Sequence, residues 1–130
     1  LQEFVRDLIA REYIAGAKDL SDGGLAVALA EMCFRPEDAV GCAVTLAGVG
    51  RPDFLLFGED ASRALIVCEA GNTKQITTAA QMAGVPCAVI GHTGGDSFSI
   101  EVNSKIEISA KVEELRQLWK GGFAKALGFD

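Results

Sequence analysis

A short polar segment, Lys18–Gly24 (K-D-L-S-D-G-G), carries the residue types that bind phosphate or a metal-bound nucleotide. An apolar stretch of mostly good helix formers, Leu25–Cys33, follows directly. It is apolar almost all round, so we expect this helix to be largely buried. The first N–H groups of such a helix lack partners within it, and the positive end of its dipole favours an anion. Because two carboxylates repel phosphate, Asp19 and Asp22 suit a site where magnesium bridges carboxylate and phosphate oxygens.

The same residues are also typical of an ordinary helix start. Ser21 or Asp22 would cap the free N–H groups with a side-chain oxygen, and Asp19 would be a solvated acid of the loop. Gly23 and Gly24 allow positive φ and close approach of another group, which suits either use of the loop. Spacing alone favours the cap, and the ligand site stays open as the alternative.

Four helices are predicted from apolar periodicity and from residues that start or stop helices. They are Leu1 to about Gly16, Leu25–Cys33, Asn72 to Gly84, and a last helix from about Ser109. In the third, Asn72 and Gln75 would form a reciprocal cap and Gly84 would stop the helix. In the last, Val112, Leu115 and Trp119 form one apolar stripe, with Trp119 as a core anchor.

Short apolar or alternating runs predict the strands. They are Val40–Leu46, Phe54–Phe57, Ala64–Cys68, Pro86–Ile90 and Ser97–Val102. The last alternates strictly and is therefore expected to be half-exposed, whereas Ala64–Cys68 and Pro86–Ile90 read as buried. Gly94 to Asp96 would join the last two strands as a hairpin. These elements predict an α+β fold, a mixed β-sheet of about five strands packed with helices.

Composition limits the class of protein. The 130 residues fit one domain, 1–130, and the net charge of −6 argues against non-specific nucleic-acid binding. No apolar run approaches a membrane span, so no membrane contact is expected. The chain begins with Leu-Gln-Glu rather than with Met, and we expect it to be a piece of a longer protein.

The four cysteines predict buried free thiols in a reducing, cytoplasmic compartment, because each lies in an apolar run and none forms a CxxC pair. They are Cys33, Cys42, Cys68 and Cys87. The one histidine, His92, has no triad or metal-ligand spacing and is expected to be a structural residue of the hairpin. Glu59, Asp60, Ser62 and Arg63 form a second polar cluster, which suits a ligand or partner site and a solvated turn equally well.

Four segments, in this order, resemble the phosphoribosylformylglycinamidine synthase family. They are Lys18–Met32, Leu56–Arg63 (L-F-G-E-D-A-S-R), Ala83–Asp96 (A-G-V-P-C-A-V-I-G-H-T-G-G-D) and Val112–Trp119. The chain is similar to the C-terminal AIR synthase-related domain of the small form of the synthetase subunit. The resemblance implies that residues 1–130 are the C-terminal fragment of a longer multidomain enzyme. The resemblance implies an AIR synthase-related C-terminal-domain-like fold in a cytoplasmic ATP- and glutamine-dependent ligase of de novo purine biosynthesis, which converts formylglycinamide ribonucleotide to the amidine.

The resemblance also implies ligands and partners. In the large single-chain form, an Asp-x-Ser pair that maps onto Asp19 and Ser21 is linked to an auxiliary magnesium–nucleotide site. We therefore predict ATP or ADP and Mg²⁺ as cofactors, with Asp19 as a metal ligand and Ser21, Gly23 and Gly24 at the phosphates. No catalytic residue is predicted, and the fragment alone should be inert. Where the family has His before that Asp, this chain has Lys18.

The expected partners are the preceding domains, a glutaminase subunit and a small bridging subunit, together with self-association through an exposed interdomain surface. One alternative is a structural module that packs against sister domains and binds nothing. A second alternative is another member of the superfamily, such as AIR synthetase, selenophosphate synthetase or thiamine-phosphate kinase. Those enzymes should differ from this chain around Leu56–Arg63 and in the loop that enters the second helix.

Overall fold

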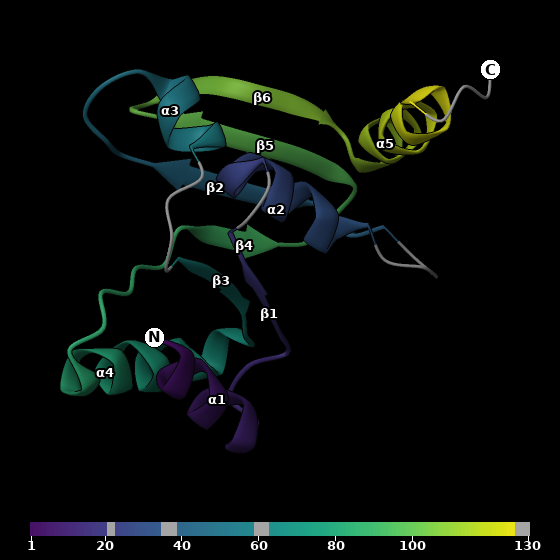
Figure 1. Ribbon diagram of the computed structural model, residues 1–130. Helices are drawn as coiled ribbons and strands as arrows, with labels where there is room; N and C mark the ends of the chain where they lie inside the picture. The colour runs from purple at the N-terminus through teal and green to yellow at the C-terminus, as the bar shows by residue number, and fades with distance from the viewer. Residues whose placement is uncertain (21–22, 35–38, 59–62, 127–130) are drawn as a thin grey trace.

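The computed structural model describes residues 1–20, 23–34, 39–58 and 63–126, the last five of them by their backbone alone. Its helices are α1 (Gln2–Ala10), α2 (Gly24–Cys33), α3 (Pro52–Phe57), α4 (Thr73–Ala83) and α5 (Val112–Ala126), with a short 3₁₀ turn at Ala70–Asn72. Its strands are β1 (Gly16–Asp19), β2 (Cys42–Leu46), β3 (Ala64–Val67), β4 (Gly91–Thr93), β5 (Ser97–Val102) and β6 (Lys105–Lys111). The predicted α+β class is confirmed (Figure 1).

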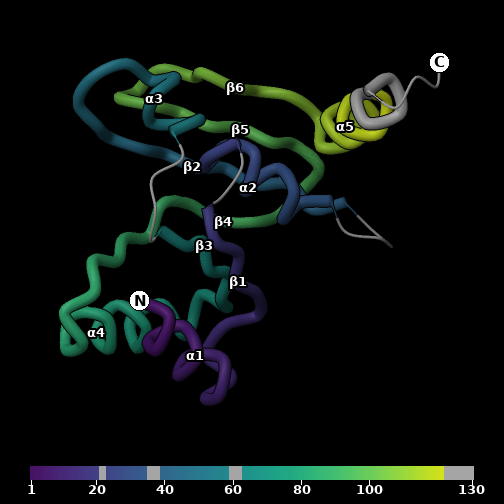
Figure 2. The backbone as a smooth tube through the Cα atoms, viewed as in Figure 1, coloured from purple at the N-terminus to yellow at the C-terminus, as the bar shows by residue number. Residues whose placement is uncertain are grey.

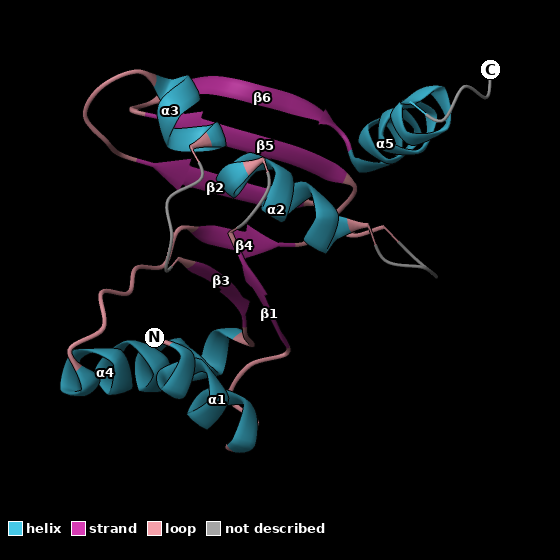
Figure 3. Ribbon diagram, in the orientation of Figure 1, coloured by secondary structure: helices cyan, strands magenta, loops and turns pink. Residues whose placement is uncertain are grey.

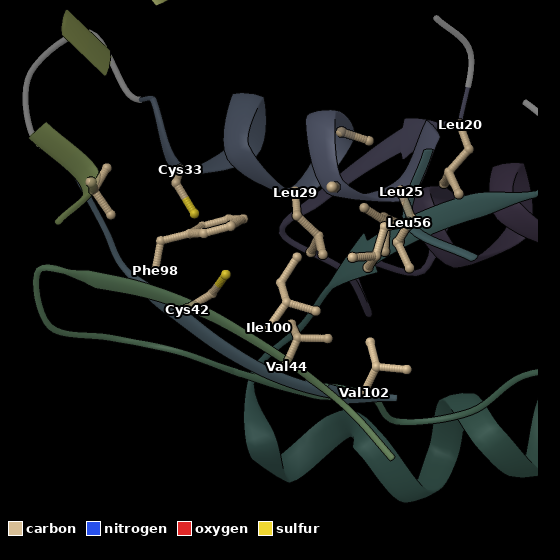
Figure 4. Packing of buried hydrophobic residues seen from close by; sticks show 14 residues of the cluster. Leu20, Leu25, Leu29, Cys33, Cys42, Val44, Leu56, Phe98, Ile100 and Val102 are labelled. Atoms are coloured by element: carbon tan, nitrogen blue, oxygen red, sulfur yellow. The ribbon is translucent and has the colours of Figure 1, made fainter. Parts of the chain in front are cut away.

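The larger sheet has the strand order β4-β2-β5-β6 and is mixed, because β2 and β5 run parallel whereas the other pairs are antiparallel. The alternation predicted for β5 is confirmed: Phe98, Ile100 and Val102 are buried. Helices α2 and α3 lie on one face of this sheet (Figure 3). The inward residues of β2 and β5 pack against α2. Figure 4 shows two residues of α2, Leu25 and Leu29, packed among these strand residues.

The smaller sheet pairs β1 with β3 antiparallel, with Lys18 opposite Leu65 and Asp19 opposite Ala64. Lys18 and Asp19, predicted to lie in a loop, are therefore the end of a strand. The backbone runs from α1 into β1, and β3 lies beside β1 (Figure 2). The sheet thus fixes Lys18 and Asp19, the first two residues of the predicted site.

The end of one helix and the type of one short element differ from the prediction. Helix α1 ends at Ala10 rather than near Gly16. By Ala15 the chain is already bonded to β3, since the Ala15 N–H donates to Val67 O at 2.7 Å. Pro52–Phe57 forms helix α3 rather than a strand, with Pro52 at its first turn, where a missing N–H costs nothing. A four-residue apolar run does not by itself distinguish helix from strand.

The region before β5 was also predicted wrongly. Residues 86–90 are not a buried strand; the strand is β4, and Val89 is 64% exposed. The hairpin through residues 94–96 is wrong too, because β2 lies between β4 and β5. Gly94 and Gly95 instead exchange backbone hydrogen bonds with Gly41, both of 2.8 Å. Strand β6 was missed, and it moves the start of the last helix from Ser109 to Val112.

Individual side chains give further corrections. Asn72 makes no side-chain cap bond, and its amide donates to Tyr13 O (3.2 Å). All four cysteines are free thiols, as expected, but only Cys33 and Cys42 are buried, whereas Cys68 is half-buried and Cys87 exposed. Trp119 is 53% exposed and is not a core anchor. No helix in the described part of the chain is long and apolar enough to cross a membrane.

Candidate functional site

A hollow of 490 Å³ lies beside α2, where that helix contacts β1 and α5. It is lined by Lys18, Asp19, Gly23, Val27, Ala28, Glu31 and Trp119. Its volume falls within the range of about 300–1,000 Å³ that is usual for small-molecule sites. Three of these residues, Lys18, Asp19 and Gly23, belong to the segment that the sequence singled out. The fold thus turns a linear motif into one wall of a concave site.

The α2 wall of the hollow consists of residues spaced four apart. Gly23, Val27 and Glu31 share one face of the helix, because residues at i and i+4 are neighbours on a helix surface. Gly23 stands at the N-cap with φ 88°, and a Cβ placed there would lie 2.6 Å from Val27 Cγ2. Glycine at this position therefore keeps the N-terminal end of α2 open toward the hollow.

Gly24 has a different role in the structure. A Cβ there would lie 2.7 Å from the Phe57 backbone carbon and 2.8 Å from Gly58 O, and φ is 73°. The end of α3 thus occupies the space that any larger residue would need. The geometry explains the second glycine by helix packing, and its contact with phosphate stays a prediction.

Lys18 crosses the hollow to α2. Its Nζ lies 2.7 Å from Glu31 Oε2, and the two side chains are 34% and 29% exposed. An ion pair with this much burial is shielded from solvent better than one at the open surface. Lys18 therefore connects β1 to α2 and neutralises the carboxylate in the wall of the hollow.

Asp19 is the last residue of β1, is exposed, and borders the same hollow. Among the described residues, no group of three or more His, Cys, Asp or Glu side chains is arranged to hold a metal ion. One exposed carboxylate still fits the way proteins hold Mg²⁺, which keeps several waters and is bound by one or two carboxylates plus phosphate oxygens. The donor set is thus compatible with a magnesium ion that arrives with a nucleotide.

Several predicted residues cannot be placed. Ser21 and Asp22 lie outside the described residues, and so do Glu59, Asp60 and Ser62. Within the second polar cluster the structure describes only Arg63, whose Nη2 donates to Gly58 O (3.0 Å). His92 is exposed on β4, opposite Ala43 of β2, and does not border the hollow.

The sequence did not identify the other four lining residues, Val27, Ala28, Glu31 and Trp119. Val27 and Glu31 could have been found from their spacing of four and eight after Gly23, since that spacing places them on one helix face. Trp119 belongs to the same apolar stripe of α5 as the buried Val112, but it lies seven residues after Val112 and is exposed. Only the packing of α5 against α2 decides that this part of the stripe borders a hollow.

A family model and individual relatives of this chain indicate the same protein family. The model of the family described as AIR synthase related protein, C-terminal domain, matches residues 1–103. A phosphoribosylformylglycinamidine synthase subunit PurL from Anaeromyxobacter sp. (strain K) is 39% identical over all of this chain, and the matched part is 18% of that relative. The PurL subunit of Brucella ovis is 41% identical over 93% of the chain and 15% of its own length. The chain thus spans less than a fifth of these relatives.

Solved structures share the fold. PurL of T. maritima complexed with ATP has a TM-score of 0.75 over 87% of this chain and 20% of its own, at 19% identity. The same protein complexed with FGAR has a TM-score of 0.76 at the same identity and coverage. Because the family model covers most of the residues, these matches establish the family and its fold together. The chain belongs to the AIR synthase related protein, C-terminal domain family.

Proposed function

We propose that this chain is the C-terminal domain of a phosphoribosylformylglycinamidine synthase synthetase subunit and forms one wall of a nucleotide-binding cleft in it. The whole protein would then be an ATP-dependent C–N ligase that converts formylglycinamide ribonucleotide to the amidine in purine biosynthesis. The relatives described above are named PurL, which favours this enzyme over the other members of the superfamily. The fragment alone would be inactive, since it supplies no catalytic group to this proposal.

The observation that carries the proposal is the hollow that brings Lys18, Asp19 and Gly23 together beside α2. In the proposed site, the backbone at Gly23 and Gly24 and the Ser21 hydroxyl face the phosphates, because a helix N-terminus attracts anions. Asp19 would hold Mg²⁺, which would offset the negative charge of the phosphates. ATP would supply a phosphoryl group or, at an auxiliary site, structural support, and Ser21 and the backbone at Gly23 and Gly24 would position its phosphates.

The similar structures support a nucleotide ligand and assembly with other subunits. T. maritima PurL is described in complex with ATP and with ADP, and another similar structure is PurLQS of that organism. We therefore propose ATP or ADP with Mg²⁺ as ligands of this protein. We further propose, as partners, the preceding domains of the same chain, a glutaminase subunit and a small bridging subunit.

A second candidate function is an interdomain packing module that binds no ligand. It is favoured by large apolar side chains that are exposed in the described part of the chain, among them Phe54 (68%), Met82 (85%) and Leu118 (72%). Single exposed apolar residues are common, but this set lies on three different helices and suits contacts with sister domains or with a second copy. This candidate predicts no nucleotide dependence on Asp19.

Two experiments test the proposal. The coding sequence upstream of Leu1 should continue into the rest of a PurL-type protein. In that whole protein, Asp19→Asn should weaken binding of radiolabelled ATP in Mg²⁺ by at least about tenfold, which corresponds to 1.4 kcal/mol. In excess EDTA, wild type and Asp19→Asn should bind ATP alike, because the lost interaction runs through the metal.

Asp7→Asn is the matched control, because it removes an exposed carboxylate that pairs with Arg11 on α1 and does not border the hollow. It should leave ATP binding unchanged. Ser21→Ala should weaken ATP binding by a smaller factor than Asp19→Asn, because it removes a neutral donor. If Asp19→Asn and Ser21→Ala change neither nucleotide binding nor thermal stability, the ligand site is refuted and the packing module remains.

A further inference from the structure

Trp119 occupies a position that its apolar stripe does not explain. Val112, Leu115 and Trp119 share one face of α5, because they are spaced by three and four residues. Val112 is fully buried and Leu115 packs against the core, whereas Trp119 is 53% exposed. The stripe begins in the core and continues over the hollow, so that the indole borders open space beside α2.

The lining of the hollow divides into two chemical classes. Lys18, Asp19 and Glu31 are charged, whereas Val27, Ala28 and Trp119 offer only apolar or aromatic surface. A nucleotide divides in the same way, into charged phosphates and a flat base with an exposed π-face. Aromatic side chains provide stacking platforms for such bases in water. No other aromatic residue of the described chain borders the hollow.

We infer that Trp119 stacks on the purine base of the nucleotide whose phosphates lie near Asp19 and Gly23. This inference rests on the proposed function and extends it by assigning the base-binding wall. It gives a ligand role to α5, which lies beyond residues 1–103 matched by the family model. Trp119 is thus a binding residue, and it takes no part in proton or phosphoryl transfer.

The test compares ATP with inorganic tripolyphosphate, which has the phosphate chain and no base. Both are titrated calorimetrically in Mg²⁺ into the whole protein that carries this chain, as wild type, Trp119→Leu, Trp119→Phe and Asp19→Asn. Leu118→Ala is the matched control, since Leu118 is 72% exposed on the same helix and does not border the hollow. Thermal unfolding of each variant monitors folding.

Stacking predicts that Trp119→Leu weakens ATP binding by about tenfold and leaves tripolyphosphate binding unchanged. Trp119→Phe should retain most of the ATP affinity, because a smaller ring still stacks. Asp19→Asn should weaken both ligands, and Leu118→Ala neither.

Three outcomes overturn the inference. If Trp119→Leu weakens ATP and tripolyphosphate equally, Trp119 acts through the structure of the site and not through the base. If Asp19→Asn weakens ATP binding and Trp119→Leu does not, the nucleotide site stands without a stacked base. If wild-type protein binds neither ligand, the stacking and the proposed nucleotide site both fail.

Discussion

Lys18 Nζ lies 2.7 Å from Glu31 Oε2 and connects the C-terminal half of strand β1 to the last turn of α2. The sequence offered no reason for a lysine at this position, where the resembling family has histidine. The structure supplies one, because Glu31 is 29% exposed and its carboxylate faces the same hollow as Asp19. Without Lys18, two carboxylates would face a cleft that is proposed to accept phosphates.

Lys18→Met should lower the free energy of unfolding by about 1 kcal/mol, because it leaves the half-buried Glu31 carboxylate without its ion-pair partner. Urea denaturation of the 130-residue chain measures this change. Lys111→Met is the control: Lys111 pairs with Asp96 at 3.1 Å, but the two side chains are 58% and 80% exposed. Its loss should cost less than about 0.5 kcal/mol. Equal losses in the two variants would show that Glu31 does not depend on Lys18.

Gly24→Ala should destabilise the protein by at least about 2 kcal/mol, because a methyl group would meet the α3 backbone and the residue has positive φ. Gly16→Ala is the matched control, since a Cβ there meets nothing within 4 Å. It should be neutral or stabilise slightly, as a Gly→Ala change does at a compatible position. A Gly24→Ala protein as stable as wild type in urea would contradict the packing of α3 on α2.

The Asp96–Lys111 pair should make stability depend on pH in acid. The hydrogen bond and the charge of Lys111 lower the pKa of Asp96 from its ordinary value of 3.8. A carboxyl whose pKa is lower in the folded state stabilises the fold above its unfolded pKa, and this contribution is lost as pH falls toward the folded value. Asp96→Asn should therefore be less stable than wild type at pH 6, and the difference should shrink as the pH falls below about 3.8 and vanish only below the lowered pKa of the folded state. In a Lys111→Met background the difference should be small at both pH values.

The thiols should react with a disulfide reagent in an order set by burial. Cys87 is exposed and should react first. Partial burial of its thiol and the nearby Cys68 raise the pKa of Cys87, so its reaction rate should increase with pH above neutrality. Cys33 and Cys42 are each 5% exposed, and the hydrogen bond with Cys33 and burial raise the pKa of Cys42. These two should react only as fast as the protein unfolds. In Cys87→Ser the fast phase should disappear; its persistence would place another thiol at the surface.

The local hydrophobic pattern was sufficient to predict burial where a single helix or strand is long enough to show a clear period. The apolar run of α2 and the alternation of β5 predicted burial correctly, because a helix or strand with one apolar face must cover that face. The loop predicted at Lys18–Gly24 was wrong for Lys18 and Asp19, which end strand β1, because pairing with β3 overrides the polar character of these residues. Prediction failed for short runs such as residues 54–57 and 86–90, where a few apolar residues suit a helix, a strand or an extended connection.

The sequence by itself determined the α+β class, the buried α2, and the polar segment that precedes it, because these follow from residue types and their periods. Only the tertiary structure decided which residues share the hollow. Lys18 and Glu31 come from the consecutive elements β1 and α2, whereas Trp119 comes from α5, far along the chain, and their proximity depends on how α2 packs against β1 and α5. Local periodicity carries no information on such contacts, since they arise from the packing of whole elements.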